Sequence, residues 1–598
     1  MNKISKHTFH IPVMGLAYTI DSPIKVARFG IASVISIVED RLIETMRSYY
    51  YPSIGREYVP ITTTEDNYRV KRITDYLNLV NIIVHQQVEK LKQSTFEAGS
   101  EIVKYFEMLP DKCSLKLRYG QMIACDNELE KENEQSYLRT QIVAGGIDVN
   151  VMTKIDKNNF GNDGKLLEDG SDAVAALRGY ANSDLSGSSI IFSAGLNPRL
   201  YNYLEKCNQF DADDEGNFKK KITIKVSDYR SALIQGKYLA KKGIWVSEFR
   251  IESGLNCGGH AFATDGFLMG PILEEFKSGK KVLVDTMFQL YNQAIQLKGH
   301  KGFSESHPVK ITAQGGIGTF EEDELLRNYY ELESTGWGTP FLLVPEATTV
   351  DDATLNLLCK AKKEDVVLSN NSPLGVRFHY LNGTTSDLEK QDRIKKGKPG
   401  SPCTEKHLAF DTEFTEQPIC TASRKYQTLK IAQLQSLNLP ETEYQEKLTK
   451  VLDKECLCIG LSNAAPAVYE VPFIKKLEAA TICPGPNIAH FSKAVTLQTM
   501  VDHIYGRTDI VHNNRPHMFI AELNLYLTYL EEQLNEDALK EPDSKRKKYY
   551  NEFFKNVKSG IDYYRQLPVL AKSNVEQFQY LLNLAEEKLN ELFLIQLA

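Results

Sequence analysis

The first 340 residues alternate about eight times between short apolar runs and helix-periodic segments. The strand-like runs cover residues 11–16, 31–38, 147–152, 189–193, 221–226, 244–251, 309–313 and 338–344. Parallel neighbours in a sheet need a long crossover, usually a helix, so this alternation predicts parallel strands. Eight such units predict an α/β fold, the (β/α)8 TIM barrel, with an open doubly wound sheet as the alternative. Glycines recur at several strand ends, which favours the barrel, because its sites gather at the carboxyl ends of many strands.

Two regions depart from this alternation. Residues 40–140 predict a helical insertion, either a lid or a packed surface bundle. Its apolar stripe at helical spacing consists of Leu77, Leu79, Val80, Ile83, Val84, Val88 and Leu91. Residues 423–436, 441–453, 488–505, 517–535, 545–566 and 575–597 also have helical patterns. A chain of 598 residues is too long for one ordinary domain. We therefore expect a barrel domain over 1–380 and a mostly α-helical C-terminal domain over 381–598.

Composition excludes several classes of protein. The formal net charge is −7, which argues against a general nucleic-acid binder, and the basic runs 219–221 and 546–548 are interpreted as solvated faces. Ten cysteines in so long a chain do not form a disulfide framework. We expect no signal peptide and no membrane contact, because no apolar run approaches the length of a bilayer span. The simplest compartment is the reducing cytoplasm.

The run Ser253-Gly254-Leu255-Asn256-Cys257-Gly258-Gly259-His260 follows a strand-like segment. Two glycines at a strand end let the backbone approach a flat ligand closely, because no Cβ intervenes. The imidazole that follows them can carry a proton near neutral pH. This pattern predicts a site for chemistry with His260 as an acid or base, although a loop histidine without a catalytic role is an open alternative.

Two further strand ends, those of the seventh and eighth predicted strands, are rich in glycine. One contains Gly315 and Gly316, and the other contains Gly338 and Thr339. In barrels the loops after the seventh and eighth strands often bind phosphate. Exposed backbone N–H groups and a threonine hydroxyl are suited to a phosphate monoester.

These motifs together resemble a known family. The resemblance rests on Pro12-Val13-Met14-Gly15, Asn150, Gly254-Leu255-Asn256-Cys257-Gly258-Gly259-His260, Gly315-Gly316-Ile317, Gly338-Thr339-Pro340-Phe341 and the segment 372–377. In order and spacing they are similar to the nitronate monooxygenase (2-nitropropane dioxygenase-like) family, which includes the FMN-dependent enoyl-acyl-carrier-protein reductases. The resemblance covers about residues 9–380 and not the C-terminal third.

The resemblance implies FMN bound in a TIM barrel. Gly315, Gly316, Gly338 and Thr339 would hold the phosphate, Met14 and Gly15 would lie along the ring, Asn150 would bind its polar edge, and Gly258 and Gly259 would approach the flavin beside His260. Nitronate-type and enoyl-type substrates both remain open, the latter small or carried as a thioester, with NAD(P)H as the possible electron donor.

One position departs from the family pattern. The family has Glu-Ala before Gly-Gly-His, whereas this chain has Asn256-Cys257. The missing carboxylate changes the charge beside the expected flavin. Cys257 is interpreted as a small buried hydrophobe, with a redox-active thiol as the alternative.

Half of the cysteines are concentrated in one part of the C-terminal third. They are Cys403, Cys420, Cys456, Cys458 and Cys483. Thiolates near glycine and proline could bind zinc or an iron–sulfur cluster, but Cys-x-Cys is a poor match to the usual Cys-x-x-Cys pair. Buried free thiols are therefore the default interpretation, and His407 and His490 are interpreted as ordinary polar residues.

Two other classes of function compete with a flavin oxidoreductase. One is a barrel enzyme that binds a phosphate ligand without redox chemistry. The other is a scaffold subunit with reduced catalysis, whose helical third binds a protein partner or a second copy of the chain. The Asn256-Cys257 departure is the main support for the scaffold.

Overall fold

The computed structural model describes residues 7–161, 164–258, 265–471, 477–512, 514–537, 544–567 and 575–597. Eight parallel strands form a closed barrel in chain order. They are β1 (Phe9–Ile11), β2 (Ala32–Ser36), β3 (Ile147–Val151), β4 (Ser188–Phe192), β5 (Lys220–Val226), β6 (Glu248–Glu252), β7 (Lys310–Gln314) and β8 (Ser334–Gly336). His10 pairs with Ala32 on one side and Gly336 on the other, which closes the barrel. The predicted (β/α)8 barrel is confirmed, and the open sheet is wrong.

Three strand predictions need correction. The final strand is β8, not residues 338–344, which form a 3-10 turn, η5 (Thr339–Leu343). Pro340 lacks the N–H that a strand ladder requires and suits the first turn of a helix. The first strand ends at Ile11, before Pro12, and the sixth begins only at Glu248.

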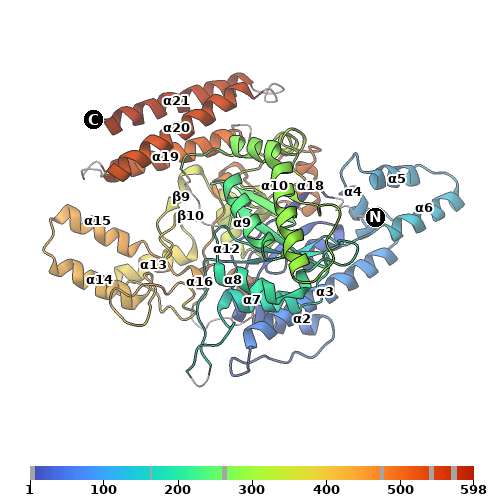
Figure 1. The fold of residues 1–598 in the computed structure, drawn as a ribbon, viewed down its shortest axis with the longest axis horizontal. Coiled ribbons are helices and arrows are strands. Elements are labelled where there is room, and N and C mark those ends of the chain that lie inside the picture. The colour runs from blue at the N-terminus through green and yellow to red at the C-terminus, as the bar shows by residue number, and fades with distance from the viewer. Residues whose placement is uncertain are drawn as a thin grey trace.

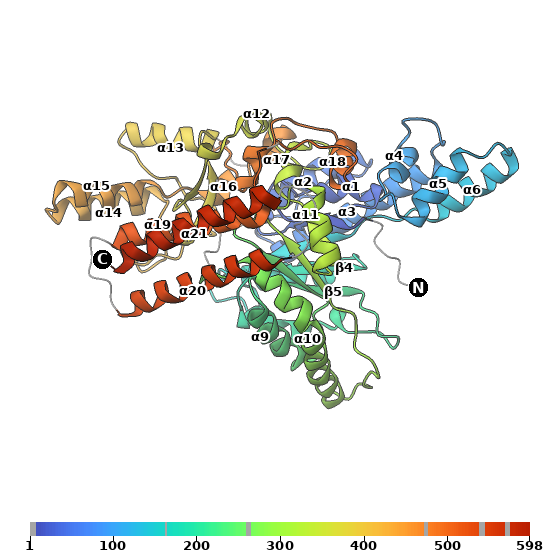
Figure 2. The same cartoon turned by 90° about the horizontal axis from the view of Figure 1, so that it is seen from above.

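Helices surround the barrel (Figures 1 and 2). Those of the barrel region are α1 (Ser22–Val26), η1 (Ala27–Phe29), α2 (Asp40–Ser53), α7 (Asp172–Asn182), α8 (Pro198–Tyr203), η2 (Leu204–Lys206), η3 (Asn208–Phe210), α9 (Tyr229–Ala240), α10 (Met269–Leu297), α11 (Phe320–Glu324), η4 (Leu325–Tyr329) and α12 (Asp352–Lys360). The pattern at 272–297 predicts two helical stretches, but α10 is one continuous helix. Pro271 falls in its first turn, where a missing N–H costs nothing.

The region 40–140 is helical as predicted, and its parts differ in how they pack. It contains α2, α3 (Tyr68–Gln93), α4 (Glu101–Glu107), α5 (Ser114–Ile123) and α6 (Glu128–Thr140). The predicted apolar stripe of α3 is buried, and α3 packs against α2 and α7 on the outside of the barrel. Helices α5 and α6 pair with each other and project from the body (Figure 2). The stripe therefore belongs to a packed outer layer.

The C-terminal third begins with a two-stranded antiparallel sheet, β9 (Val366–Ser369) and β10 (Phe378–Leu381), and is helical beyond it. Its helices are η6 (Lys363–Asp365), α13 (Thr385–Lys395), α14 (Arg424–Ser436), α15 (Glu441–Leu452), α16 (Leu457–Gly460), α17 (Ala464–Val468), η7 (Pro486–His490), α18 (Leu497–Ile504), α19 (Met518–Asp537), α20 (Ser544–Gln566) and α21 (Val575–Leu597). The pattern at 488–505 is split between η7 and α18 rather than forming one helix. Helices α19–α21 pack together and rest on α10 (Figure 1).

The inside and the outside of the barrel differ in polarity. The large apolar core lies between the strands and the surrounding helices, whereas Val13, Val34 and Ile191 form a small separate cluster. Successive strand residues point to opposite sides, so alternate residues of β6, namely Glu248, Arg250 and Glu252, share one side. All three are largely inaccessible to solvent. This polar stripe leads to the carboxyl end of the barrel.

The basic run 219–221 is not a solvated face throughout, because Lys220 is buried. Its Nζ donates to the carbonyl oxygens of Tyr180 in α7 and of Ser183 and Leu185 just beyond that helix, at 2.9–3.1 Å. Burial, and secondarily Lys219, lowers the pKa of Lys220 to about 8. The lysine therefore ties the amino end of β5 to the end of α7.

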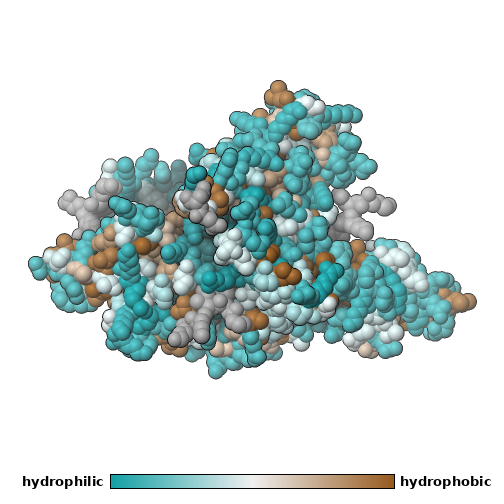
Figure 3. All heavy atoms as spheres, turned by 90° about the horizontal axis from the view of Figure 1, so that it is seen from below, coloured by the Kyte–Doolittle hydropathy of each residue, from teal (hydrophilic) through white to brown (hydrophobic). Residues whose placement is uncertain are grey.

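The face seen from below is mostly hydrophilic, with hydrophobic residues scattered in small groups (Figure 3). Among the helices of the described residues, none combines the length and apolarity needed to cross a bilayer.

Candidate active site at the carboxyl end of the barrel

The predicted site residues that the structure describes all lie at one end of the barrel. Met14 and Gly15 follow β1, Asn150 lies in β3, Gly258 follows β6, and the two glycine motifs follow β7 and β8. A Cβ on Gly258 would lie 2.6 Å from the Cα of Met14, so the loops after β1 and β6 touch. The barrel thus brings together motifs that are far apart in the sequence. Gly259 and His260 lie outside the described residues.

The loop after β7 has the features of an anion cradle. Gly315 and Gly316 have φ values of 108° and 81°, and a Cβ would lie 2.6 Å from Ser253 Oγ and 2.5 Å from Leu255 Cδ1, respectively. Both positions therefore require glycine.

Four backbone N–H groups of the two glycine-rich loops donate no hydrogen bond within the described part of the chain. They belong to Gly315, Gly316, Ile317 and Gly338. The first three residues are buried, and Gly338 is half-buried. Buried N–H groups without a partner are rare because they cost free energy. Several such groups on adjacent strand ends are suited to a bound anion.

A segment of the C-terminal third lies across the same loops. The Thr339 hydroxyl donates to the carbonyl of Pro484 at 2.6 Å, and the N–H of Gly258 donates to that of Cys483 at 3.0 Å. The side chain of Asn487 donates to the carbonyl of Ile317 at 3.0 Å. The run 483–487 therefore forms one wall of the site. The Thr339 hydroxyl, which was expected to bind the phosphate, instead hydrogen-bonds to the backbone of this run.

Arg515, which sequence reasoning missed, lies against the anion cradle. Its guanidinium pairs with Glu322 at 2.7 Å and donates to the carbonyl of Gly316 at 2.6 Å. Burial opposes ionisation of Glu322, but the charge and hydrogen bonds of Arg515 outweigh it and lower the pKa of that carboxyl. The pair is buried and ionised, so it fixes the turn after β7 to the chain preceding α19.

A second group that sequence reasoning missed occupies the ends of β5, β6 and β7. Lys225 Nζ lies 3.2 Å from Glu252 Oε1, and the same oxygen accepts from Asn256 at 2.7 Å and from Gln314 at 2.8 Å. Glu252 thus places a carboxylate directly beside the side chain of Asn256. The alternation of polar residues along β6 could have indicated this group from the sequence.

FMN can be tested against these residues. The four N–H groups without a described partner fit a phosphate. The buried Oδ1 of Asn150 also has no partner among the described residues, so it could accept a hydrogen bond from the polar edge of a ligand. A cavity of about 60 Å³ lies nearby, lined by Gly15, Gly258, Met152 and residues of the C-terminal third, including Cys458. Ordinary ligand pockets exceed about 300 Å³. The hydrogen-bonding groups fit FMN, but the cavity is too small for it unless neighbouring side chains move outward.

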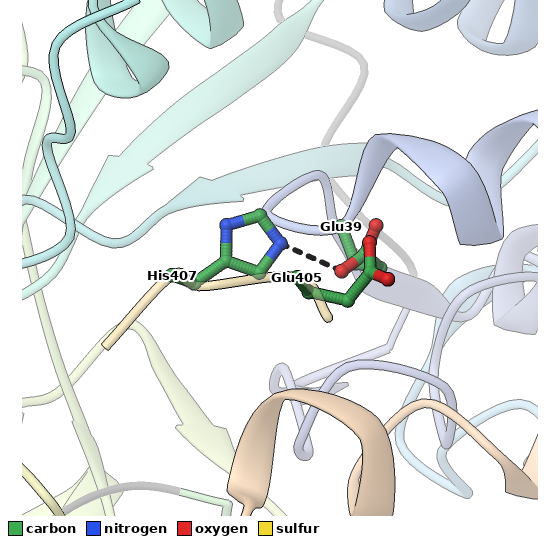
Figure 4. A group of neighbouring side chains, drawn as sticks. All are labelled: Glu39, Glu405 and His407. Atoms are coloured by element: carbon green, nitrogen blue, oxygen red, sulfur yellow. Dashed lines mark hydrogen bonds and ion pairs between the residues drawn. The ribbon is translucent and has the colours of Figure 1, made fainter. Parts of the chain in front are cut away.

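Glu39, Glu405 and His407 form another compact cluster beside the barrel (Figure 4). His407 Nε2 lies 2.6 Å from Glu39, and its Nδ1 lies 3.6 Å from Asp172. Burial opposes its charge, but the nearby carboxylate of Asp172 and the hydrogen bond to Glu39 raise the pKa of His407 to about 9. These contacts form an ion-pair network that fastens the C-terminal third to the barrel.

One thiol, that of Cys257, is buried at the site. Burial holds the pKa of Cys257 well above its usual range, and the Cys257 thiol donates to the carbonyl of Cys483 at 3.2 Å. The interpretation of Cys257 as a small buried residue therefore agrees with its surroundings. His490 is half-buried, and burial, together with Arg515, lowers its pKa to about 4.

No protein-family model and no curated protein matches the chain. Among solved structures, it is similar to the nitroalkane oxidase from Streptomyces ansochromogenes, with 9% identity and a TM-score of 0.27. The match covers 64% of this chain and 85% of the oxidase. Such values assign neither family nor activity, and the barrel assignment rests on the strand pairing.

Proposed function

We propose that the chain is a flavin-type oxidoreductase that binds FMN at the carboxyl end of its barrel. The observation that carries the proposal is the set of four N–H groups, on Gly315, Gly316, Ile317 and Gly338, that have no partner in the described part of the chain. They occur after β7 and β8, where barrels often bind phosphate. Asn150, with its unpaired Oδ1, supports the same ligand on the opposite side of the mouth.

Each residue of the site has a distinct part in this proposal. The glycine-rich loops bind the phosphate, Met14 and Gly15 support the ring, and Asn150 orients its polar edge. Bound FMN supplies hydride transfer. Glu252 and Lys225 keep a buried, mutually neutralising pair of charges at the mouth, which orients Asn256 and Gln314 through hydrogen bonds.

Substrate and donor follow from the resemblance and complete the proposal. His260 acts as acid or base toward an enoyl- or nitronate-type substrate, and NAD(P)H is the electron donor. Lys154 follows β3 at the same end of the barrel. Burial lowers its pKa, whereas the negative charge of Glu252 raises it.

The decisive experiment compares FMN with riboflavin, which lacks the phosphate. Fluorescence titration of the purified chain is expected to give at least about tenfold tighter binding of FMN, since charge-assisted hydrogen bonds contribute about 1.5–3 kcal/mol each. Inorganic phosphate should weaken FMN binding only. Equal affinities for the two flavins would refute the anion cradle.

A matched pair of variants isolates one donor. Ile317→Pro removes an unpaired N–H, and Ile317→Val keeps it. The proline variant is expected to lose FMN affinity while its riboflavin affinity and melting temperature stay close to those of the valine variant. A parallel loss of both flavins would point to a disturbed loop rather than a lost phosphate contact.

The scaffold is a second candidate, favoured by the small cavity and by the contact between Thr339 and Pro484. A chain that takes up neither flavin nor inorganic phosphate would favour it. Phosphate binding without flavin uptake would instead favour a barrel enzyme without redox chemistry.

A further inference from the structure

Every carbonyl oxygen from Gln314 to Gly318 accepts a hydrogen bond from another part of the chain. Ser253 binds the first two, because its N–H donates to Gln314 at 3.2 Å and its hydroxyl donates to Gly315 at 3.1 Å. The other three carbonyls are bound by side chains of the C-terminal third. These side chains are Arg515 at Gly316, Asn487 at Ile317 and His503 at Gly318, at 2.6, 3.0 and 2.8 Å.

These donors also decide where the N–H groups of the loop point. A planar trans peptide directs its carbonyl and its N–H in opposite directions. Holding the carbonyl of one residue therefore aims the N–H of the next. The N–H groups without a described partner, on Gly315, Gly316 and Ile317, belong to peptides whose carbonyls are held in this way. The N–H groups thus point away from Ser253 and Arg515, toward the space that a ligand would occupy.

Arg515 is the centre of this arrangement. Its guanidinium binds both carboxylate oxygens of Glu322, at 2.7 and 2.9 Å, and its Nε donates to Asn487 Oδ1 at 2.8 Å. The N–H of Gly318 in turn donates to Glu322 at 2.8 Å. One planar guanidinium therefore holds one peptide of the loop directly and, through Glu322 and Asn487, the next peptide at both ends.

The glycine at position 318 makes room for this guanidinium. A Cβ on Gly318 would lie 2.7 Å from Arg515 Cζ, a separation that real Cβ atoms do not show. Gly318 does not have a positive φ, in contrast to Gly315 and Gly316. The first two glycines of the motif therefore shape the turn, and the third admits Arg515.

Arg515 is itself fixed in place. Its N–H donates to the carbonyl of His512 at 3.1 Å, and the N–H of His512 donates to that of His490 at 3.2 Å. The side chains of Arg515 and Glu322 are 5% and 2% exposed. Because the buried pair carries no net charge, the attraction for an anion comes from the N–H groups of the loop. Arg515 determines their direction.

We infer that Arg515 is a positioning residue of the anion cradle, through which the C-terminal third takes part in binding the phosphate of a ligand. It acts through the carbonyl of Gly316 and through Glu322 and Asn487, and it does not contact the phosphate. The cradle binds a phosphate group whichever molecule carries it, so only the identity of that molecule as FMN rests on the proposed function. The C-terminal third is then a part of the site itself.

The test measures binding by the full-length chain with two kinds of probe. Calorimetry with inorganic phosphate reports on the cradle alone, and fluorescence titration compares FMN with riboflavin. Arg515→Lys keeps the charge, but an ammonium cannot bind three groups with the fixed geometry of a guanidinium. We expect this variant to bind phosphate and FMN at least about tenfold more weakly, and riboflavin within about twofold of the wild type.

Arg47→Lys is the matched control. Arg47 is also buried and binds two carboxylates, those of Glu44 at 2.7 Å and Asp75 at 2.6 Å, but it belongs to α2 in the outer layer. This variant should keep all three affinities.

A second variant decides the question where Arg515→Lys does not fold, as judged by circular dichroism. Asn487→Ala removes the hydrogen bond to the Ile317 carbonyl without leaving a buried charge unpaired. It should bind phosphate and FMN about threefold more weakly and riboflavin unchanged.

Two results would overturn the inference alone. One is a folded Arg515→Lys variant with the phosphate and FMN affinities of the wild type. The other is a parallel loss of FMN and riboflavin binding, which would show that Arg515 only supports the fold. A wild-type chain that binds neither phosphate nor flavin would overturn the inference and the proposed function together. Phosphate binding that Arg515→Lys weakens, without any flavin uptake, would support the inference and refute the flavin.

Discussion

Replacing His407 with glutamine should weaken the attachment of the C-terminal third to the barrel in a pH-dependent way. His407 is buried between Glu39, at 2.6 Å, and Asp172, at 3.6 Å. Its interactions with these two carboxylates raise its pKa from 6.5 to about 9 against the opposing effect of burial. Glutamine can still donate a hydrogen bond, but it carries no charge.

The size and sign of the effect follow from the pKa. One pKa unit corresponds to about 1.36 kcal/mol, so the protonated imidazole contributes about 3 kcal/mol to the free energy of unfolding. Because the folded pKa exceeds the unfolded value, this contribution is complete below about pH 6.5. It is lost as the pH rises through about 9. His407→Gln should therefore cost about 3 kcal/mol at pH 6 and much less at pH 9.5.

The assay is urea denaturation of both proteins at pH 6, 7.5 and 9.5. Exposed His85, replaced in the same way, serves as the control and should change stability by less than about 0.5 kcal/mol. Nuclear magnetic resonance of labelled histidine gives the pKa of His407 directly. A pKa at or below 6.5, or a stability loss that is equal at pH 6 and 9.5, would refute the reasoning.

Two further predictions concern other buried positions. Burial raises the pKa of Glu522 in α19 to about 8, so its protonated form is stable in the fold and stability is lost as the pH rises from 4.5 through 8. Glu522→Gln should raise the free energy of unfolding by about 3 kcal/mol at pH 7 and leave it unchanged at pH 4. Exposed Glu576→Gln, the control, should leave it unchanged at both pH values. A difference that does not depend on pH would contradict this prediction. Gly316→Ala should lower the melting temperature more than Gly55→Ala: both residues have positive φ, but a Cβ at 316 meets Leu255 at 2.5 Å and one at 55 meets nothing within 4 Å. Equal losses in calorimetry would show that only backbone strain, about 1–2 kcal/mol, is involved.

The alternation of strands and helices was readable from the sequence because it depends on local periodicity. Helices α14, α15, α20 and α21 begin and end close to the predicted bounds. The final strand was misplaced because residues 338–344 are as apolar as a strand. Pairing of β8 with β1 selected residues 334–336, and this pairing joins the first and the last strand of the barrel.

The site could be predicted only in part, because some of its contacts join residues that are far apart in the sequence. Glycines at strand ends mark positions that local backbone geometry demands, and the fold places them at one end of the barrel. The pair of Lys225 and Glu252, however, joins two strands, and the alternation of polar residues along β6 does not tell which strand supplies the partner of Glu252. Arg515 meets Glu322 although the two are far apart in the sequence.

The sequence by itself determined the class of fold, the order of strands and helices, and the glycines at the carboxyl end of the barrel. These features depend on near neighbours along the chain. The tertiary structure alone decided that 483–487 lies on the mouth and that the thiol of Cys257 meets the carbonyl of Cys483. Such contacts depend on which distant surfaces fit and bury each other. No local pattern encodes that choice, since a thiol or a Pro-Gly turn has the same local preferences wherever the chain carries it.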